Sequence, residues 1–173
     1  FNGWDQFIDC DNLTRVTLRN GGYIPTNAFS GCINLEEISI IQFGLSGITI
    51  QDLAFNGCEK LTTINTNSEI IFVGWQTFFD CYVLDNLLLS INSYTNDEIY
   101  SATFNNCTTL SSTIIPSNIR RIGTLAYAYC SNLLIIYSYA VVPPELEYTS
   151  SNHSPFYGVP TSATVYVPQG SGN

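Results

Sequence analysis

The chain has 173 residues, enough for one domain with a core of its own, and we expect a single domain. Its formal net charge is −9, with 14 acidic and 5 basic side chains, which argues against a nucleic-acid partner because phosphate binding requires clustered Lys and Arg. No apolar run reaches the roughly 18 residues of a membrane span, and charged residues make up only 11% of the chain. Such a neutral, hydrogen-bonding surface is typical of secreted proteins.

The chain does not begin as a newly translated secreted protein would. It contains no Met and begins at Phe1 without a basic and apolar leader, which is typical of a processed product or an excised fragment. Trp4 would cover the end of the core if the chain started here, but we favour further repeats ahead of it. The cluster of Asp5, Asp9 and Asp11 lacks the glycine and the terminal Glu of a calcium loop, so a solvated turn is the favoured interpretation.

Six cysteines recur along the chain at intervals of 22 to 26 residues. They are Cys10, Cys32, Cys58, Cys81, Cys107 and Cys130. An aromatic residue precedes each cysteine by three positions: Phe7, Phe29, Phe55, Phe78, Phe104 and Tyr127. A leucine follows each cysteine by three positions: Leu13, Leu35, Leu61, Leu84, Leu110 and Leu133. A period of this length lies in the range of leucine-rich repeats.

One short strand is predicted after each cysteine. The residues six and eight positions later are mostly apolar, as with Ile38 and Ile40 in the second repeat, and this alternation buries one side of a strand. Successive repeats run in the same direction, so their strands should pair in parallel and need a covering layer. The aromatic segment before each cysteine should form that layer in a turn or two of helix.

The C-terminal segment departs from this pattern. From Pro143 onward the repeated columns stop in the sequence, and prolines interrupt the chain. We therefore divide the chain into six leucine-rich-type repeats over residues 1–140 and a capping segment over residues 141–173. Residues 164–167 alternate as a strand that can add to the open edge of the sheet.

These columns resemble the BspA-like leucine-rich repeats, whose unit reads approximately Ala-Phe-x-x-Cys-x-x-Leu-x-x-Ile-x-Ile-Pro, followed by Ile-x-x-Ile-Gly. The fifth repeat, with Phe104, Cys107, Leu110 and Ile115, is the best copy. The resemblance implies an α/β solenoid: a right-handed superhelix with a parallel β-sheet on the concave face, short helical or 3-10 turns on the other side, and a strand-containing C-terminal cap. It also implies a bacterial or protist cell-surface protein linked to adhesion, anchored through a part outside this chain.

The cysteines raise the question of disulfides. Stacked parallel side chains hold their Cβ atoms about 4.8 Å apart, beyond the roughly 3.5 to 4.5 Å of a bridge, so we expect six reduced, buried thiols that donate weakly to the backbone. No Cys and His spacing fits zinc, and we expect no metal and no cofactor. His153, the single histidine, lies in a Ser-rich loop without the pattern of a catalytic triad, and we expect no enzyme.

The open side of the strands is the candidate binding surface. Its outward positions, five and seven after each cysteine, are charged or small and polar in the first three repeats and largely apolar in the last three. The candidate binding residues on this concave face are Asn65, Asn86, Leu88, Ile114, Ile135, Tyr137 and Tyr139. Exposed apolar and aromatic groups on a rigid sheet are typical of an interaction site, and the alternative is that the C-terminal tail folds over them.

The function that follows is an extracellular or cell-surface binding module of the adhesion type. Its partner would be a protein or glycan on host or neighbouring cells. The alternative is a structural spacer or stalk that displays another domain. Fold resemblance by itself identifies no ligand.

Overall fold

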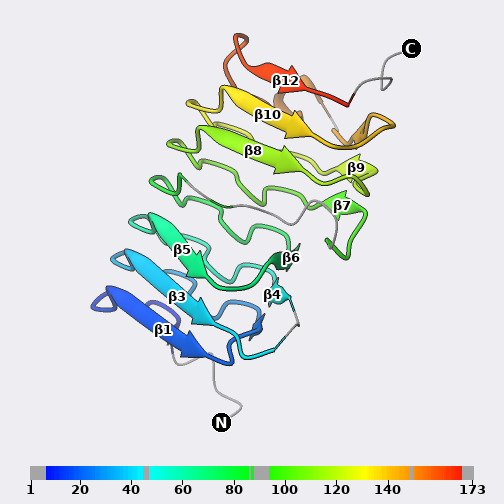
Figure 1. Ribbon diagram of the computed structural model, residues 1–173. Helices are drawn as coiled ribbons and strands as arrows, with labels where there is room; N and C mark the ends of the chain where they lie inside the picture. The colour runs from blue at the N-terminus through cyan, green and yellow to red at the C-terminus, as the bar shows by residue number, and fades with distance from the viewer. Residues whose placement is uncertain (1–6, 45–46, 86, 88–93, 149, 169–173) are drawn as a thin grey trace.

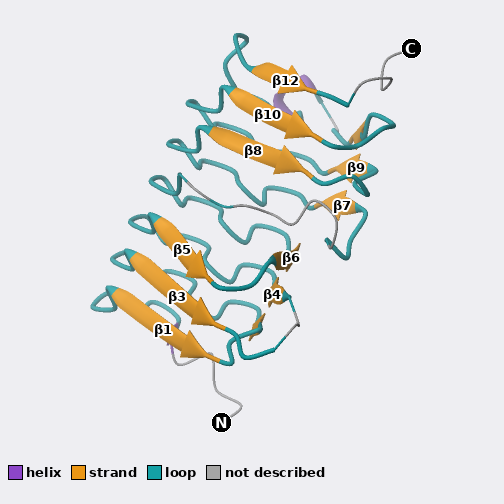
Figure 2. Ribbon diagram, in the orientation of Figure 1, coloured by secondary structure: helices purple, strands orange, loops and turns teal. Residues whose placement is uncertain are grey.

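The computed structural model describes residues 7–44, 47–85, 87, 94–148 and 150–168, and in them the chain winds into a parallel β-solenoid (Figure 1). In the described residues, the strands form two faces that run along the solenoid (Figure 2). Trp4 and Asp5, which the sequence placed at the N-terminal end, lie outside the described residues.

The strands of the first face follow five of the six cysteines as predicted, and the position of the strand predicted after Cys81 lies mostly outside the described residues. This face consists of β1 (Arg15–Arg19), β3 (Glu37–Ile41), β5 (Thr63–Thr66), β8 (Ser112–Ile115), β10 (Ile135–Ser138) and the C-terminal β12 (Thr164–Tyr166). All pair in parallel, in the orders β1-β3-β5 and β8-β10-β12. Each residue pairs with the residue at the same repeat position in the next coil, so Val16 lies opposite Ile38, and Ile38 opposite Ile64. The pairing of β12 with β10 confirms the predicted strand at the C-terminal edge.

The remaining strands form a second parallel face that the sequence did not predict. They are β2 (Tyr23–Ile24), β4 (Ile48–Ile50), β6 (Ile70–Val73), β7 (Glu98–Ile99), β9 (Arg121–Ile122) and β11 (Glu145–Leu146). A buried β-branched residue stands eight positions before each cysteine from the second onward: Ile24, Ile50, Val73, Ile99 and Ile122. This column is the signal that would have located the second face.

The predicted helical turns are wrong, and the fold is a β-solenoid rather than an α/β one. Two residues per coil have a left-handed backbone, one directly before the cysteine and one four positions earlier. Their φ angles are 50 to 60° at Asn27, Leu53, Gln76, Ala102 and Leu125, and 54 to 74° at Asp9, Gly31, Gly57, Asp80, Asn106 and Tyr129. Left-handed residues this closely spaced prevent a right-handed helix. The helical element with described bounds is the 3-10 turn η2 (Ser151–His153).

Hydrogen bonds between coils hold these turns together in place of a helix. The amide of each buried aromatic residue of the ladder donates to the carbonyl of the residue directly before the aromatic residue of the next coil. Phe29 N lies 2.8 Å from Ala54 O, and Phe104 N lies 2.7 Å from Ala126 O. The backbone of the turn layer is therefore paired along the solenoid axis, much like the strands.

The aromatic residues stack into one continuous ladder inside the solenoid. Ring centroids of neighbours from Phe7 to Tyr127 lie 5.1 to 5.6 Å apart. Phe156 adds a further rung, with its ring 5.4 Å from that of Tyr127 and parallel to it within 1°. The aromatic column thus continues beyond Pro143, although the sequence indicated that the columns stop there.

The cysteines form a second ladder next to the aromatic one, and all six are free, as predicted. Each thiol from the second onward donates to the carbonyl of the aromatic residue in the preceding coil, as Cys81 Sγ does to Phe55 O at 3.1 Å. Five are buried. The prediction of burial is wrong for Cys10, which is only half-buried because no described coil covers the N-terminal side of its own.

Gly74 and Gly123, directly after β6 and β9, allow the second face to lie close to the turn layer of the preceding coil. A Cβ atom at Gly123, directly after β9, would lie 2.6 Å from Ser101 N, closer than real Cβ contacts. We therefore expect Gly123→Ala to lower the free energy of unfolding by about 1 to 3 kcal/mol, since the coils must move apart. Urea unfolding followed by circular dichroism measures the loss. The matched control is Asn132→Ala, at an exposed turn position of the following repeat, and an equal loss there would contradict the steric explanation.

Candidate binding surface

The strand face consists of the outward side chains of β1, β3, β5, β8, β10 and β12. Its N-terminal half is polar. Arg15 Nε lies 3.8 Å from Glu37 Oε2, and Asn65 Nδ2 donates to Glu37 Oε1 at 2.7 Å. These contacts are solvent-exposed and contribute little to stability. Asn65, a predicted binding residue, is thus part of a polar row on the first three strands.

The C-terminal half of the strand face is apolar and aromatic. The register places Tyr137 of β10 between Ile114 of β8 and Tyr166 of β12. The rings of Tyr137 and Tyr166 stack with centroids 5.2 Å apart. Tyr137, Tyr139 and Tyr166 are 40%, 43% and 53% exposed. Together with the half-buried Ile114 and Ile135, they form what we call the tyrosine patch.

Four of the seven predicted binding residues lie close together in the structure, and one lies apart from them. Ile114, Ile135, Tyr137 and Tyr139 lie on or directly after adjacent strands, whereas Asn65 lies on β5 at the polar end of the face. Asn86 and Leu88 lie outside the described residues.

The sequence reasoning missed Tyr166. The signal was present, since the alternation in residues 164–167 that predicted the edge strand also places Tyr166 on its outward side. The alternative in which the tail covers the patch is contradicted by the described tail residues, because β12 lies beside β10 and extends the sheet. The tail therefore enlarges the patch.

Two further kinds of group could carry chemistry in the described residues, the Ser150 and His153 pair and possible metal ligands. Ser150 Oγ lies 2.8 Å from His153 Nδ1, but both are exposed and only three residues apart in the 3-10 turn. Over the described residues, no group of three or more His, Cys, Asp or Glu side chains is placed to hold a metal ion. In the same part of the chain, no helix has the length and hydropathy needed to cross a bilayer.

Comparison with known proteins identifies a family match and similar solved structures. The model of the BspA type leucine rich repeat region matches residues 3–134 in six copies. The structure is similar to a leucine-rich repeat protein from Bacteroides ovatus ATCC 8483, with a TM-score of 0.63 and 20% identity over 93% of this chain and 38% of that one. It is also similar to a leucine rich cell surface protein from Faecalibacterium prausnitzii A2-165, with a TM-score of 0.51 and 22% identity over 82% of this chain and 44% of that one.

The chain spans less than half the length of both solved proteins, and at these identities the likeness concerns the fold alone. A search of curated proteins gives no match. The six matched copies cover most of the chain. The chain therefore belongs to the BspA-type leucine-rich repeat family.

Proposed function

We propose that the chain is a binding module on the cell surface or outside the cell, of the adhesion type, and that its tyrosine patch contacts a protein partner on host or neighbouring cells. Leucine-rich repeats are in general protein-interaction modules and non-enzymatic scaffolds, which supports the class of function. The Faecalibacterium protein is known as a cell surface protein, which supports the location. Anchoring would come from a part of the protein outside this chain.

The tyrosine patch is the observation that carries the proposal. Tyrosine provides a large apolar area with a hydroxyl for hydrogen bonding, and it is enriched among residues that dominate binding energy. The patch is held on paired strands, so few backbone degrees of freedom are lost when a partner binds. A polar row at the other end of the same face provides the rim of such an interface. A glycan is the alternative ligand at the same patch.

The test is a double variant, Ile114→Asp with Tyr137→Asp, assayed for adhesion to a panel of host matrix proteins and cells. We expect binding to weaken about 30-fold or more, since removal of a central aromatic contact typically costs about 2 kcal/mol and a buried carboxylate adds a penalty. The matched control is Thr17→Asp, at the same outward position of β1 in the polar half. It should leave adhesion unchanged.

The competing proposal is a spacer that displays another domain. It predicts that the double variant, folded as judged by its circular dichroism and melting temperature, adheres as well as the wild type. Equal losses in the double variant and in Thr17→Asp would instead assign binding to the whole face and contradict the role of the tyrosine patch.

A further inference from the structure

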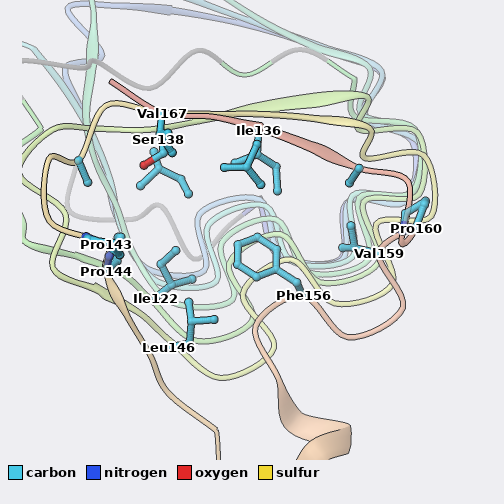
Figure 3. Close-up of a pocket in the computed structure, with 14 residues that line it drawn as sticks. Ile122, Ile136, Ser138, Pro143, Pro144, Leu146, Phe156, Val159, Pro160 and Val167 are labelled. Atoms are coloured by element: carbon cyan, nitrogen blue, oxygen red, sulfur yellow. The ribbon is translucent and has the colours of Figure 1, made fainter. Parts of the chain in front are cut away.

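The C-terminal end of the solenoid contains a cavity of about 420 Å³ on the inner side of the strands whose outer side carries the tyrosine patch. Ser138 and Val167 line one wall, and Ile122, Leu146 and Phe156 line the opposite wall (Figure 3). The space therefore lies inside the last coils. Tyr137 and Ser138, adjacent on β10, point to opposite sides of the sheet.

Small side chains in the sixth repeat create this space. The position eight residues after the cysteine is Ile40 in the second repeat and Ile115 in the fifth, and both are buried. In the sixth repeat it is Ser138, and the next inward residue is Ala140; both are also buried. Close-packed interiors leave few voids larger than a water molecule, so this cavity is a distinct feature of the C-terminal coils.

The lining defines the chemistry of what can enter. Ser138 brings the one hydroxyl among the fourteen described lining residues, and none of them is charged. Apolar cavities of about 150 Å³ stay dry and take up benzene, and pockets of about 300 to 1,000 Å³ hold small ligands. The cavity is in the second range. An uncharged, apolar guest fits it, whereas an ionised group would lose its hydration without a partner.

The volume, the access and the charge of the cavity further restrict the class of molecule that can bind in it. If each methylene group of an alkyl chain takes up about 30 Å³, as a water molecule does, the cavity holds roughly a dozen chain carbons. Val165 and Val167 are 54% and 59% exposed, although both alternate toward the interior, so they form an open apolar entrance. Glu145 and Glu147 flank the lining residue Leu146, and the whole chain has a net charge of −9, which disfavours an anionic head group.

We propose that this cavity binds the alkyl chain of an uncharged lipid, of the class of fatty alcohols and monoacylglycerols. The lipid would enter between β12 and β11 and lie across the ring of Phe156 (Figure 3). This site is independent of the tyrosine patch, and either can fail without the other.

The experiment fills the cavity with the side chain that other coils have there. The neutral fluorescent probe N-phenyl-1-naphthylamine is titrated into the protein and displaced by 1-dodecanol, with dodecanoate as the anionic comparison. Wild type should bind the probe and release it to the alcohol at least tenfold more readily than to the carboxylate. Ser138→Ile should weaken probe binding at least tenfold and raise the melting temperature, because the added side chain packs into the void.

Ser39→Ile is the matched control, since it makes the same change on the outward side of β3, and it should leave probe binding unchanged. Ala140→Val is a second filling variant in case Ser138→Ile does not fold. The proposal is overturned if wild type does not bind the probe, if both filling variants bind it as well as wild type does, or if dodecanoate displaces it equally.

Other occupants give different results. If wild type sediments as a dimer and Ser138→Ile as a monomer, the cavity holds a second copy of the chain and the lipid proposal is wrong. If the reading frame continues past Asn173 and the longer protein does not bind the probe, a following coil fills the cavity, which also overturns the proposal.

Discussion

Replacement of Phe55 by alanine is expected to lower the free energy of unfolding by about 3 to 5 kcal/mol. Phe55 is fully buried, and its ring lies 5.5 Å from that of Phe29 and 5.6 Å from that of Phe78. Truncation removes both stacking contacts and leaves a void that paired coils on either side cannot close. Since domains are stable by about 5 to 15 kcal/mol in all, this one change removes a large share of the total.

Urea unfolding monitored by far-ultraviolet circular dichroism measures this effect. Phe156→Ala is the matched control at the end of the same ladder, where the described residues provide one stacked neighbour, Tyr127, and the ring is only half-buried. Its loss should be clearly smaller. Equal losses of stability at the two positions would show that stacking between coils does not cause the large loss expected at Phe55.

Alkaline pH is expected to unfold the protein cooperatively. Burial raises the pKa of Cys58, Cys81 and Cys107 well above the ordinary value of 9.0, and that of Cys130 to about 12. Below pH 9 the thiols are protonated in both the folded and the unfolded state, and the stability is fully present. Above pH 9 only the unfolded chain loses these protons, so the fall in stability approaches about 1.4 kcal/mol per pH unit for each thiol, or about 5.5 kcal/mol per unit for the four.

The free energy of unfolding should therefore be measured between pH 7 and pH 10.5 in the presence of a reductant. The double variant Cys81→Val with Cys107→Val separates the thiols from the other groups that ionise in this range. It should reduce the slope above pH 9 by about 3 kcal/mol per pH unit, whatever its stability at pH 7. An unchanged slope would mean that these thiols ionise equally in the folded and the unfolded protein.

The strands and the ladders could be predicted because their signals repeat. A two-residue alternation seen six times, at a fixed distance from a cysteine, determines which side of each strand is buried, and the structure confirms this for Ile38, Ile64 and Ile136. The same alternation placed Ile114 and Tyr137 on the outward side. The part of the candidate surface that follows from side-chain direction was therefore accessible from sequence.

The turn layer could not be predicted from residue type. Gly31 and Gly57 signal a left-handed backbone, but Leu53, Gln76 and Ala102 adopt it as well, at a cost of roughly 1 kcal/mol or more each. Amides of neighbouring coils offset this cost, as when Leu53 N donates to Trp75 O at 3.0 Å. Such bonds join residues more than twenty positions apart, so no local rule contains them. The strands of the second face are two to four residues long, which is likewise too short to show a period.

The cavity could not be predicted from the sequence for a different reason. The sequence predicts that position 138 points inward, but whether a serine there leaves a void depends on the volumes contributed by Ile122, Leu146 and Phe156 from other segments. Direction follows from one strand, whereas volume is a property of all the walls together.

The pairing of each position with its equivalent in the next coil has a consequence for how such a protein changes over evolutionary time. Strand partners, aromatic rungs and thiol donors all relate a residue to its own column, so every internal interface repeats the same contacts. Gain or loss of one whole coil would join two surfaces that already match. Gain or loss of a few residues is accommodated between the columns, as the cysteine intervals of 22 to 26 residues show. The number of coils in such a solenoid can therefore change without the formation of a new kind of interface.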